Sequence, residues 1–185
     1  MACLLANGRA EACKDAIGGL KNLYIANFDI EPADITYDGT DTDLITAITG
    51  IANLYKFELK GNNSFVENIN SSRENGTTFF EQVLSIELKN KDAATTKNIK
   101  LLSYGRPHIV VETNGGQYFI GGLLRGMDVT AGSIEAGTQL GDFSGYKLTF
   151  TGQEKTPANH LDCTTEAALA TLFATSAVDA TIVAS

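Results

Sequence analysis

The residue types best able to do chemistry meet in one short stretch of this sequence, His160-Leu161-Asp162-Cys163. Imidazole, carboxylate and thiolate groups are ligands that zinc accepts, and a cysteine beside a histidine can act as a nucleophile with its base. The stretch stands alone, however, because the chain has no His-x-x-x-His pair and no Cys-x-x-Cys pair. Spacing within a loop does not by itself fix catalytic geometry, so we interpret these side chains as loop polarity.

Two other groups have the residue types for ligand binding but not the spacing. The first is a set of neighbouring aspartates: Asp34, Asp38, Asp41 and Asp43. They lack the glycine at position six and the glutamate at position twelve of an EF-hand calcium loop. The glycine pairs at 115–116 and 121–122 do not precede a helix, as a phosphate-binding loop does. We therefore expect no metal, no cofactor and no enzymatic activity.

Composition limits the partners further. The 185 residues carry a net charge of −8, with 22 acidic and 14 basic residues, and this excess repels phosphate. Tight nucleic-acid binding is therefore disfavoured, although DNA could still pass such a surface without adhering. The three cysteines form no framework, so we expect reduced thiols. We see no signal peptide, since the apolar run at residues 1–6 is too short, and no stretch reaches the roughly 20 apolar residues of a membrane span.

The elements that must position these residues are mostly strands. In residues 145–151, Tyr146, Leu148 and Phe150 alternate with polar residues, which is the period of a half-buried strand. The segments 54–60 and 80–89 alternate in the same way. With the polar segment 61–76 between them, they predict one long β-hairpin over residues 54–89. The charged residues on the polar face of this hairpin, which we call its charged backs, are Lys56, Glu58, Lys60, Glu81, Glu87 and Lys89.

The remaining segments complete a single predicted domain, residues 1–185. Asp92 can cap a helix over residues 92–104, and Asn114-Gly115 is a strong turn signal in a second hairpin over 108–120. Before these elements we expect a short helix at 10–16, a strand at 23–28 and an exposed loop at 29–53 that contains one short strand at 35–37. After them we expect a short strand near 127–130 and a C-terminal extension at 159–185. The extension should contain a helix at 164–174 and end in a strand or an arm. The fold class we predict is mainly β, an antiparallel β-sandwich or barrel with one flanking α-helix.

Several of these segments resemble a known family. The order is a helix beginning DAAT, a hairpin with the turn NGGQYF, a glycine-rich GMDVTAG segment and then GDFSGYKLTFTGQEKTPA, within residues 92–158. Together with CKDAIGGLKNLYIANF at residues 13–28, this order resembles small virion proteins of tailed bacteriophages, of the tail tube type. The C-terminal extension departs from a plain tube subunit and keeps a neck, baseplate or head-associated protein open as an alternative.

The resemblance implies subunits that form hexameric rings, which stack into a tube through which genomic DNA passes without specific binding. It also implies other tail proteins as partners, location in the virion after synthesis in the host cytoplasm, and no membrane. The charged backs of the 54–89 hairpin are then expected to face the channel, and the 29–53 loop and the C-terminal extension to meet the next ring. A second hypothesis belongs to a different class of function: a β-rich module that binds carbohydrate or a host surface.

Overall fold

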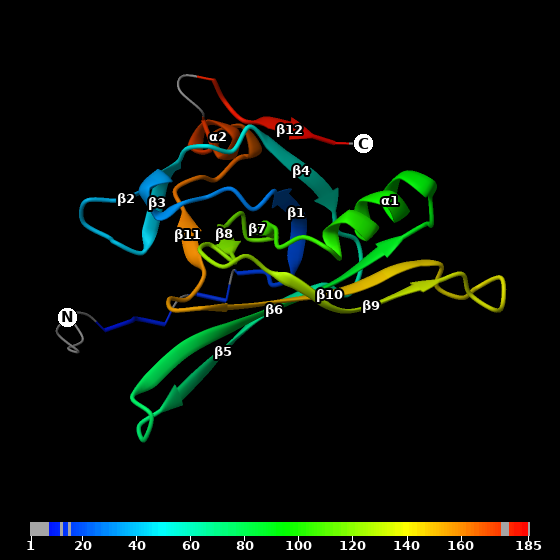
Figure 1. The fold of residues 1–185 in the computed structure, drawn as a ribbon, viewed down its shortest axis with the longest axis horizontal. Coiled ribbons are helices and arrows are strands. Elements are labelled where there is room, and N and C mark those ends of the chain that lie inside the picture. The colour runs from blue at the N-terminus through cyan, green and yellow to red at the C-terminus, as the bar shows by residue number, and fades with distance from the viewer. Residues whose placement is uncertain (1–7, 12, 15, 175–177, 185) are drawn as a thin grey trace.

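The computed structural model describes residues 8–11, 13–14, 16–174 and 178–184, which form two β-sheets and two α-helices (Figure 1). Sheet A has the strand order β12-β4-β1-β7-β8-β11-β3-β2, and sheet B has the order β5-β6-β10-β9. The elements are β1 (Leu20–Ala26), a 3-10 turn (Pro32–Asp34), β2 (Ile35–Tyr37), β3 (Leu44–Ile48), β4 (Asn53–Glu58), β5 (Ser64–Ser72), β6 (Thr77–Lys89), α1 (Ala93–Leu102), β7 (His108–Thr113), β8 (Tyr118–Gly121), β9 (Asp128–Glu135), β10 (Gly145–Glu154), β11 (Asn159–Leu161), α2 (Glu166–Leu172) and β12 (Thr181–Val183).

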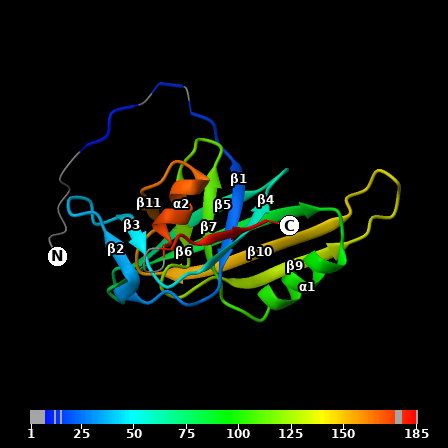
Figure 2. The same cartoon turned by 90° about the horizontal axis from the view of Figure 1, so that it is seen from above.

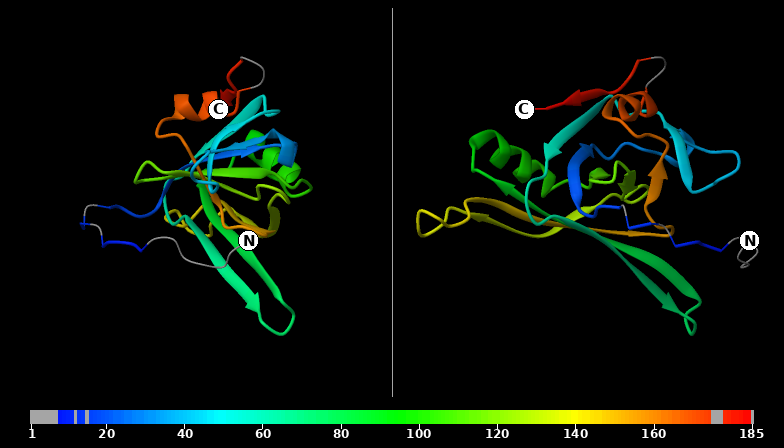
Figure 3. Two further views of the ribbon diagram at one scale, coloured as in Figure 1. Left: turned by 90° about the vertical axis from the view of Figure 1, so that its left-hand side faces the viewer. Right: turned by 180° about the vertical axis from the view of Figure 1, so that it is seen from behind.

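Sheet A is the central layer of the molecule. Helix α2 covers one of its faces and sheet B covers the other, with α1 beside them (Figures 1 and 3). Successive residues of β1 therefore enter two different cores: Tyr24 faces the core under α2, and Ile25 faces the core between the sheets. A strand buried on both faces needs a continuous apolar run. The runs LYIA in β1 and IVV in β7 meet that need.

Sheet B is buried on one face only. Leu84 of β6 is paired with Phe150 of β10, and both are fully buried in the core between the sheets. Their neighbours along each strand point away from sheet A and are partly exposed. This arrangement confirms the predicted alternation at 145–151 and the predicted mainly β, two-layered fold with a flanking helix.

The long hairpin differs from the one predicted. Its strands are β5 and β6, so it covers Ser64–Lys89, and the segment at 61–76 that we expected to be its tip is mostly the strand β5. The 54–60 segment contains β4, which pairs with β1 and β12 of sheet A instead. The reason lies in packing: Leu54 is completely buried in the core under α2, where only sheet A can place it.

Other expectations fare differently. Helix α1 and its Asp92 cap are confirmed, since the Thr95 amide donates to Asp92 Oδ1 at 2.7 Å. The second hairpin, the C-terminal helix and the short strand at 35–37 are confirmed too. The predicted loop over 29–53 is wrong in part, because it also holds β3. The helix at 10–16 is wrong for the described residues of that segment, which are exposed and have no helix or strand.

Candidate functional site

The most distinctive surface is the outer face of sheet B, the face turned away from sheet A. Most of its side chains carry hydroxyl or amide groups: Ser64, Asn68, Asn70, Ser72, Thr77, Ser85, Thr130, Ser133, Thr149, Thr151 and Gln153. Two of them bond to each other across strands, since Thr130 Oγ1 and Thr151 Oγ1 lie 2.9 Å apart. Six charged residues share this face: Glu81, Glu87, Lys89, Asp128, Glu135 and Lys147.

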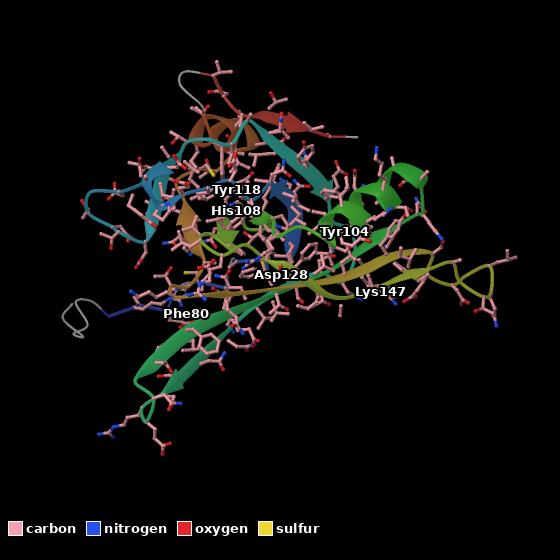
Figure 4. The ribbon with its side chains drawn as sticks, viewed as in Figure 1. Phe80, Tyr104, His108, Tyr118, Asp128 and Lys147 are labelled. Carbon is pink, nitrogen blue, oxygen red and sulfur yellow. The ribbon has the colours of Figure 1, made fainter. Side chains whose placement is uncertain are left out.

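The charges on the outer face are partly paired. Lys147 Nζ lies 3.2 Å from Glu135 Oε2, and the Asn68 amide donates to Glu81 at 3.4 Å. Figure 4 shows Lys147 and Asp128 on the strands of sheet B, and His108 and Tyr118 in sheet A above them. The named acidic residues of this face outnumber its lysines, so the face keeps the negative sign of the whole chain.

The two edges of sheet B are the second feature of this surface. Strands β5 and β9 each have one hydrogen-bonded neighbour among the described strands. All pairs in the sheet are antiparallel, so β5 and β9 run in opposite directions. The hairpin β5–β6 also projects beyond the body (Figures 1 and 3), and its apolar residues Val66 and Ile69 are 48 % and 70 % exposed. Long open edges with exposed apolar residues are a hazard in a monomer, because they attract other strands.

The structure separates the six predicted channel-facing residues. Glu81, Glu87 and Lys89 lie on the outer face of β6. Glu58 and Lys60 lie together, 3.5 Å apart, and Gly61 after them lies beside Glu87 and Lys89.

Lys56 lies elsewhere. It is paired across sheet A with Tyr24, which places it on the face under α2, and its Nζ binds Glu166 Oε2 at 2.6 Å. The prediction assumed that β4 belonged to the long hairpin, so it could not foresee this position.

Sequence reasoning missed a buried carboxylate in sheet A. Glu112 is 3 % exposed and accepts bonds from Lys21 Nζ and Asn22 Nδ2 at 2.6 Å and from Tyr24 Oη at 3.1 Å. Burial alone would raise its pKa, but the bonds from Lys21, Asn22 and Tyr24 together lower the pKa below its ordinary value. Its partners come from a strand about 90 positions away, and no local pattern in the sequence indicates them.

The same network fastens α2 to sheet A. Tyr24 Oη also lies 3.1 Å from Glu166 Oε2, so one phenol group stands between two carboxylates. Burial, followed by the charge of Glu112, raises the pKa of Tyr24, so its hydroxyl keeps its proton. Each carboxylate also has a lysine partner at 2.6 Å, Lys21 for Glu112 and Lys56 for Glu166. We interpret this chain of bonds as a structural connection, because its donors and acceptors satisfy one another.

The histidine–cysteine stretch offers no nucleophile. Cys163 is buried in the core under α2, whereas His160 is exposed on β11 and lies edge-on to Phe119. Burial raises the pKa of the Cys163 thiol to about 12, which keeps it protonated and unreactive at neutral pH. In the described ranges, no group of three or more histidine, cysteine, aspartate or glutamate residues is placed to hold a metal ion.

His108 is a structural histidine. Its Nδ1 donates to the Gly122 carbonyl at 2.7 Å, and its Nε2 accepts the amides of Asp29 and Ile30 at 3.3 and 3.2 Å. Burial lowers its pKa, which favours the neutral ring that these bonds require. Gly122 has a φ of 65°, and an added Cβ would lie 2.6 Å from Gly126, so the close turn behind the ring requires glycine.

The aspartate cluster also has a local structural role. Asp38 Oδ1 accepts the amides of Thr40 and Asp41 at 2.8 and 2.9 Å, which closes the turn between β2 and β3. The backbone bonds from Asp41 and Thr40 lower the pKa of Asp38, so it is charged at neutral pH. Asp38 therefore acts as a turn residue that bonds to the backbone two and three positions ahead.

Comparisons with known proteins give no relative. No protein-family model matches the chain, and neither a curated protein nor a solved structure is similar to it. Among the residues that the structure describes, no helix is both long and apolar enough to cross a membrane.

Proposed function

We propose that this protein is a structural subunit that assembles with itself into stacked rings, and that its sheet B lines the channel of a phage tail tube. The observation that carries the proposal is the pair of open edges on sheet B. Because β5 and β9 run in opposite directions, β9 of one copy can pair antiparallel with β5 of the next. Repeating this contact around an axis closes a continuous barrel and leaves sheet B without an open edge.

The outer face of sheet B supports the same proposal. A channel for DNA must be wetted but must not hold phosphate, because cations bind the backbone and slow its passage. Hydroxyl and amide groups provide the polar surface, and Glu81 and Glu87 repel the DNA backbone. Tail proteins and passing DNA are the partners that follow from this proposal, and the virion is the location. The hexameric state follows only from the resemblance described above.

The experiment shortens the projecting hairpin. Removing residues 69–80 and joining Asn68 to Glu81 through Asn-Gly keeps their paired register but removes the outer half of the edge strand. We expect this variant to stay folded by circular dichroism and to form no rings. Negative-stain electron microscopy over a range of protein and salt concentrations should show hollow rings or tubes for the wild type, because salt screens the like-charged subunits.

A matched control separates strand pairing from the turn itself. Replacing only residues 73–76 with Asn-Gly leaves β5 and β6 complete, and this variant should assemble as the wild type does. Tubes formed by the variant lacking residues 69–80 would contradict a role for the β5 edge. Small particles from the wild type under every condition would favour a β-rich binding module instead.

A further inference from the structure

An apolar groove lies between α1 and the neighbouring strands of sheet A. Its volume is about 450 Å³, and Ile25, Phe28, Tyr55, Phe57, Leu101 and Leu102 contribute its apolar lining. Three of these side chains remain substantially exposed: Leu101 at 59 %, Phe28 at 49 % and Tyr55 at 39 %. Exposed apolar surface that is gathered in one concave place marks a contact site. We call it the α1 groove.

The chain itself contains an apolar segment without charge, residues 1–6, with the sequence MACLLA. It is joined to the body through residues 8–18, which we call the arm. All described residues of the arm are exposed, including Ile17 at 69 %, and none belongs to a helix or strand. Where the arm meets the body, Asn114 Nδ2 donates to the Gly18 carbonyl at 3.0 Å.

The arm and the α1 groove lie on opposite sides of the molecule. The arm enters β1 at Leu20, whereas Ile25 and Phe28, at and beyond the other end of β1, line the groove. Figure 2 shows the arm leaving the body on the side away from α1. A ten-residue extended segment reaches roughly 33 Å, far enough to meet a neighbouring molecule. A contact between two different surfaces of identical copies is heterologous, which is the type that closes rings.

We propose that residues 1–6 of one copy bind in the α1 groove of a neighbouring copy. Leu4 and Leu5 supply apolar side chains for the groove, and Arg106 and Asn98 at its rim stay available to the polar backbone of the bound segment. This inference rests on the proposed function in one respect, because it takes the partner to be a second copy of the chain. It does not depend on the pairing of β5 with β9.

The test uses native Cys3 as a reporter in full-length chains. One variant keeps Cys3 and carries C13S. A second variant, of different mass, carries C3S, C13S and N98C, which places a thiol at the groove. We expect oxidation of the mixture to give a disulfide-linked product of both masses on a non-reducing gel. Buried Cys163 stays in both chains because it is protected.

Two controls decide the outcome. Replacing N98C by K97C moves the thiol to the neighbouring exposed position on α1 that does not line the groove, and should remove most of the product. Adding L4D and L5D to the first chain should lower the yield at least about tenfold, because charge opposes transfer into an apolar site. Equal yields at both positions, or no dependence on Leu4 and Leu5, would overturn the proposal.

The same assay distinguishes this proposal from the ring proposal. In the background that lacks residues 69–80, a product that persists would support the groove contact even if that background forms no tubes. If the mixture of the Cys3 chain and the N98C chain forms tubes without any link between the two thiols, the groove contact is rejected and the ring proposal stays intact.

Discussion

The two sheets of this protein use the same strand geometry in opposite ways. In sheet A, neighbouring residues of β1 and β7 enter different cores, so Tyr24 and Ile25 are both buried. In sheet B, only one face is buried, and the other presents hydroxyl and amide groups to solvent. Sheet A also binds α2, because Tyr24 and Lys56 contact Glu166. The edge strands of sheet A, β12 and β2, have three residues each, whereas the edge strands of sheet B, β5 and β9, have nine and eight. Sheet A therefore holds the fold together, and sheet B provides the surface that we propose for assembly.

The largest effect on the free energy of unfolding should come from comparing a substitution on each face of β10. Phe150 is fully buried between the sheets, and its neighbour Thr151 lies on the outer face. We expect Phe150→Ala to lower the free energy of unfolding by about 3–5 kcal/mol, since it leaves a cavity. Thr151→Ala should change it by no more than about 0.5 kcal/mol. Urea unfolding followed by circular dichroism measures both, and similar losses would contradict the assignment of faces.

A smaller effect on the free energy of unfolding should distinguish the buried carboxylate Glu112 of sheet A from the more exposed carboxylate Glu135 of sheet B. Glu112→Gln removes the charge that Lys21 and Asn22 bind, and should lower the free energy of unfolding by about 1.5–3 kcal/mol at pH 7. Glu135→Gln, whose partner Lys147 is exposed to solvent, should have a much smaller effect.

The pH dependence of Glu112→Gln follows from the direction of the pKa shift. The pKa of Glu112 is lowered on folding from its ordinary 4.5, so its charged form stabilises the fold above that pH. This stabilisation is lost as pH falls below 4.5 and through the lower pKa of the folded state. The difference between wild type and Glu112→Gln should therefore shrink between pH 5 and acid conditions. A difference that grows in acid would mean that Glu112 is held protonated.

The smallest effect on stability should come from a charge reversal that changes how strongly the outer face of sheet B binds DNA. The double variant E81K and E87K reverses two charges on the outer face of β6, and should alter the free energy of unfolding by at most about 0.5 kcal/mol per site. It should retain duplex DNA at low salt where the wild type does not, and lose it as salt rises. The control E11K and D179K changes net charge equally but away from this face. Equal DNA retention by both variants would show that net charge, and not the outer face, governs adhesion.

Local signals in the sequence identified the elements whose structure is decided by neighbouring residues. The alternation at 145–151, the Asp92 cap and the Asn114-Gly115 turn each act within a few positions, and each predicted its element. The strand β5 escaped this reasoning because its hairpin leaves the body. With both faces near water, its residues 64–72 do not need to alternate strongly, and Asn and Ser residues suggested a loop instead.

The sequence by itself determined that this chain is acidic and is built from half-buried strands and a capped helix, because periodicity and capping act between neighbouring residues and net charge is a sum over the chain. Only the tertiary structure decided which strands pair. It placed β4 in sheet A and so moved Lys56 to α2, and it joined Glu112 to Lys21 and Asn22 across some 90 positions. Such pairings depend on which arrangement buries the most apolar surface while every buried charge finds a partner, and the energies of distant contacts decide that choice.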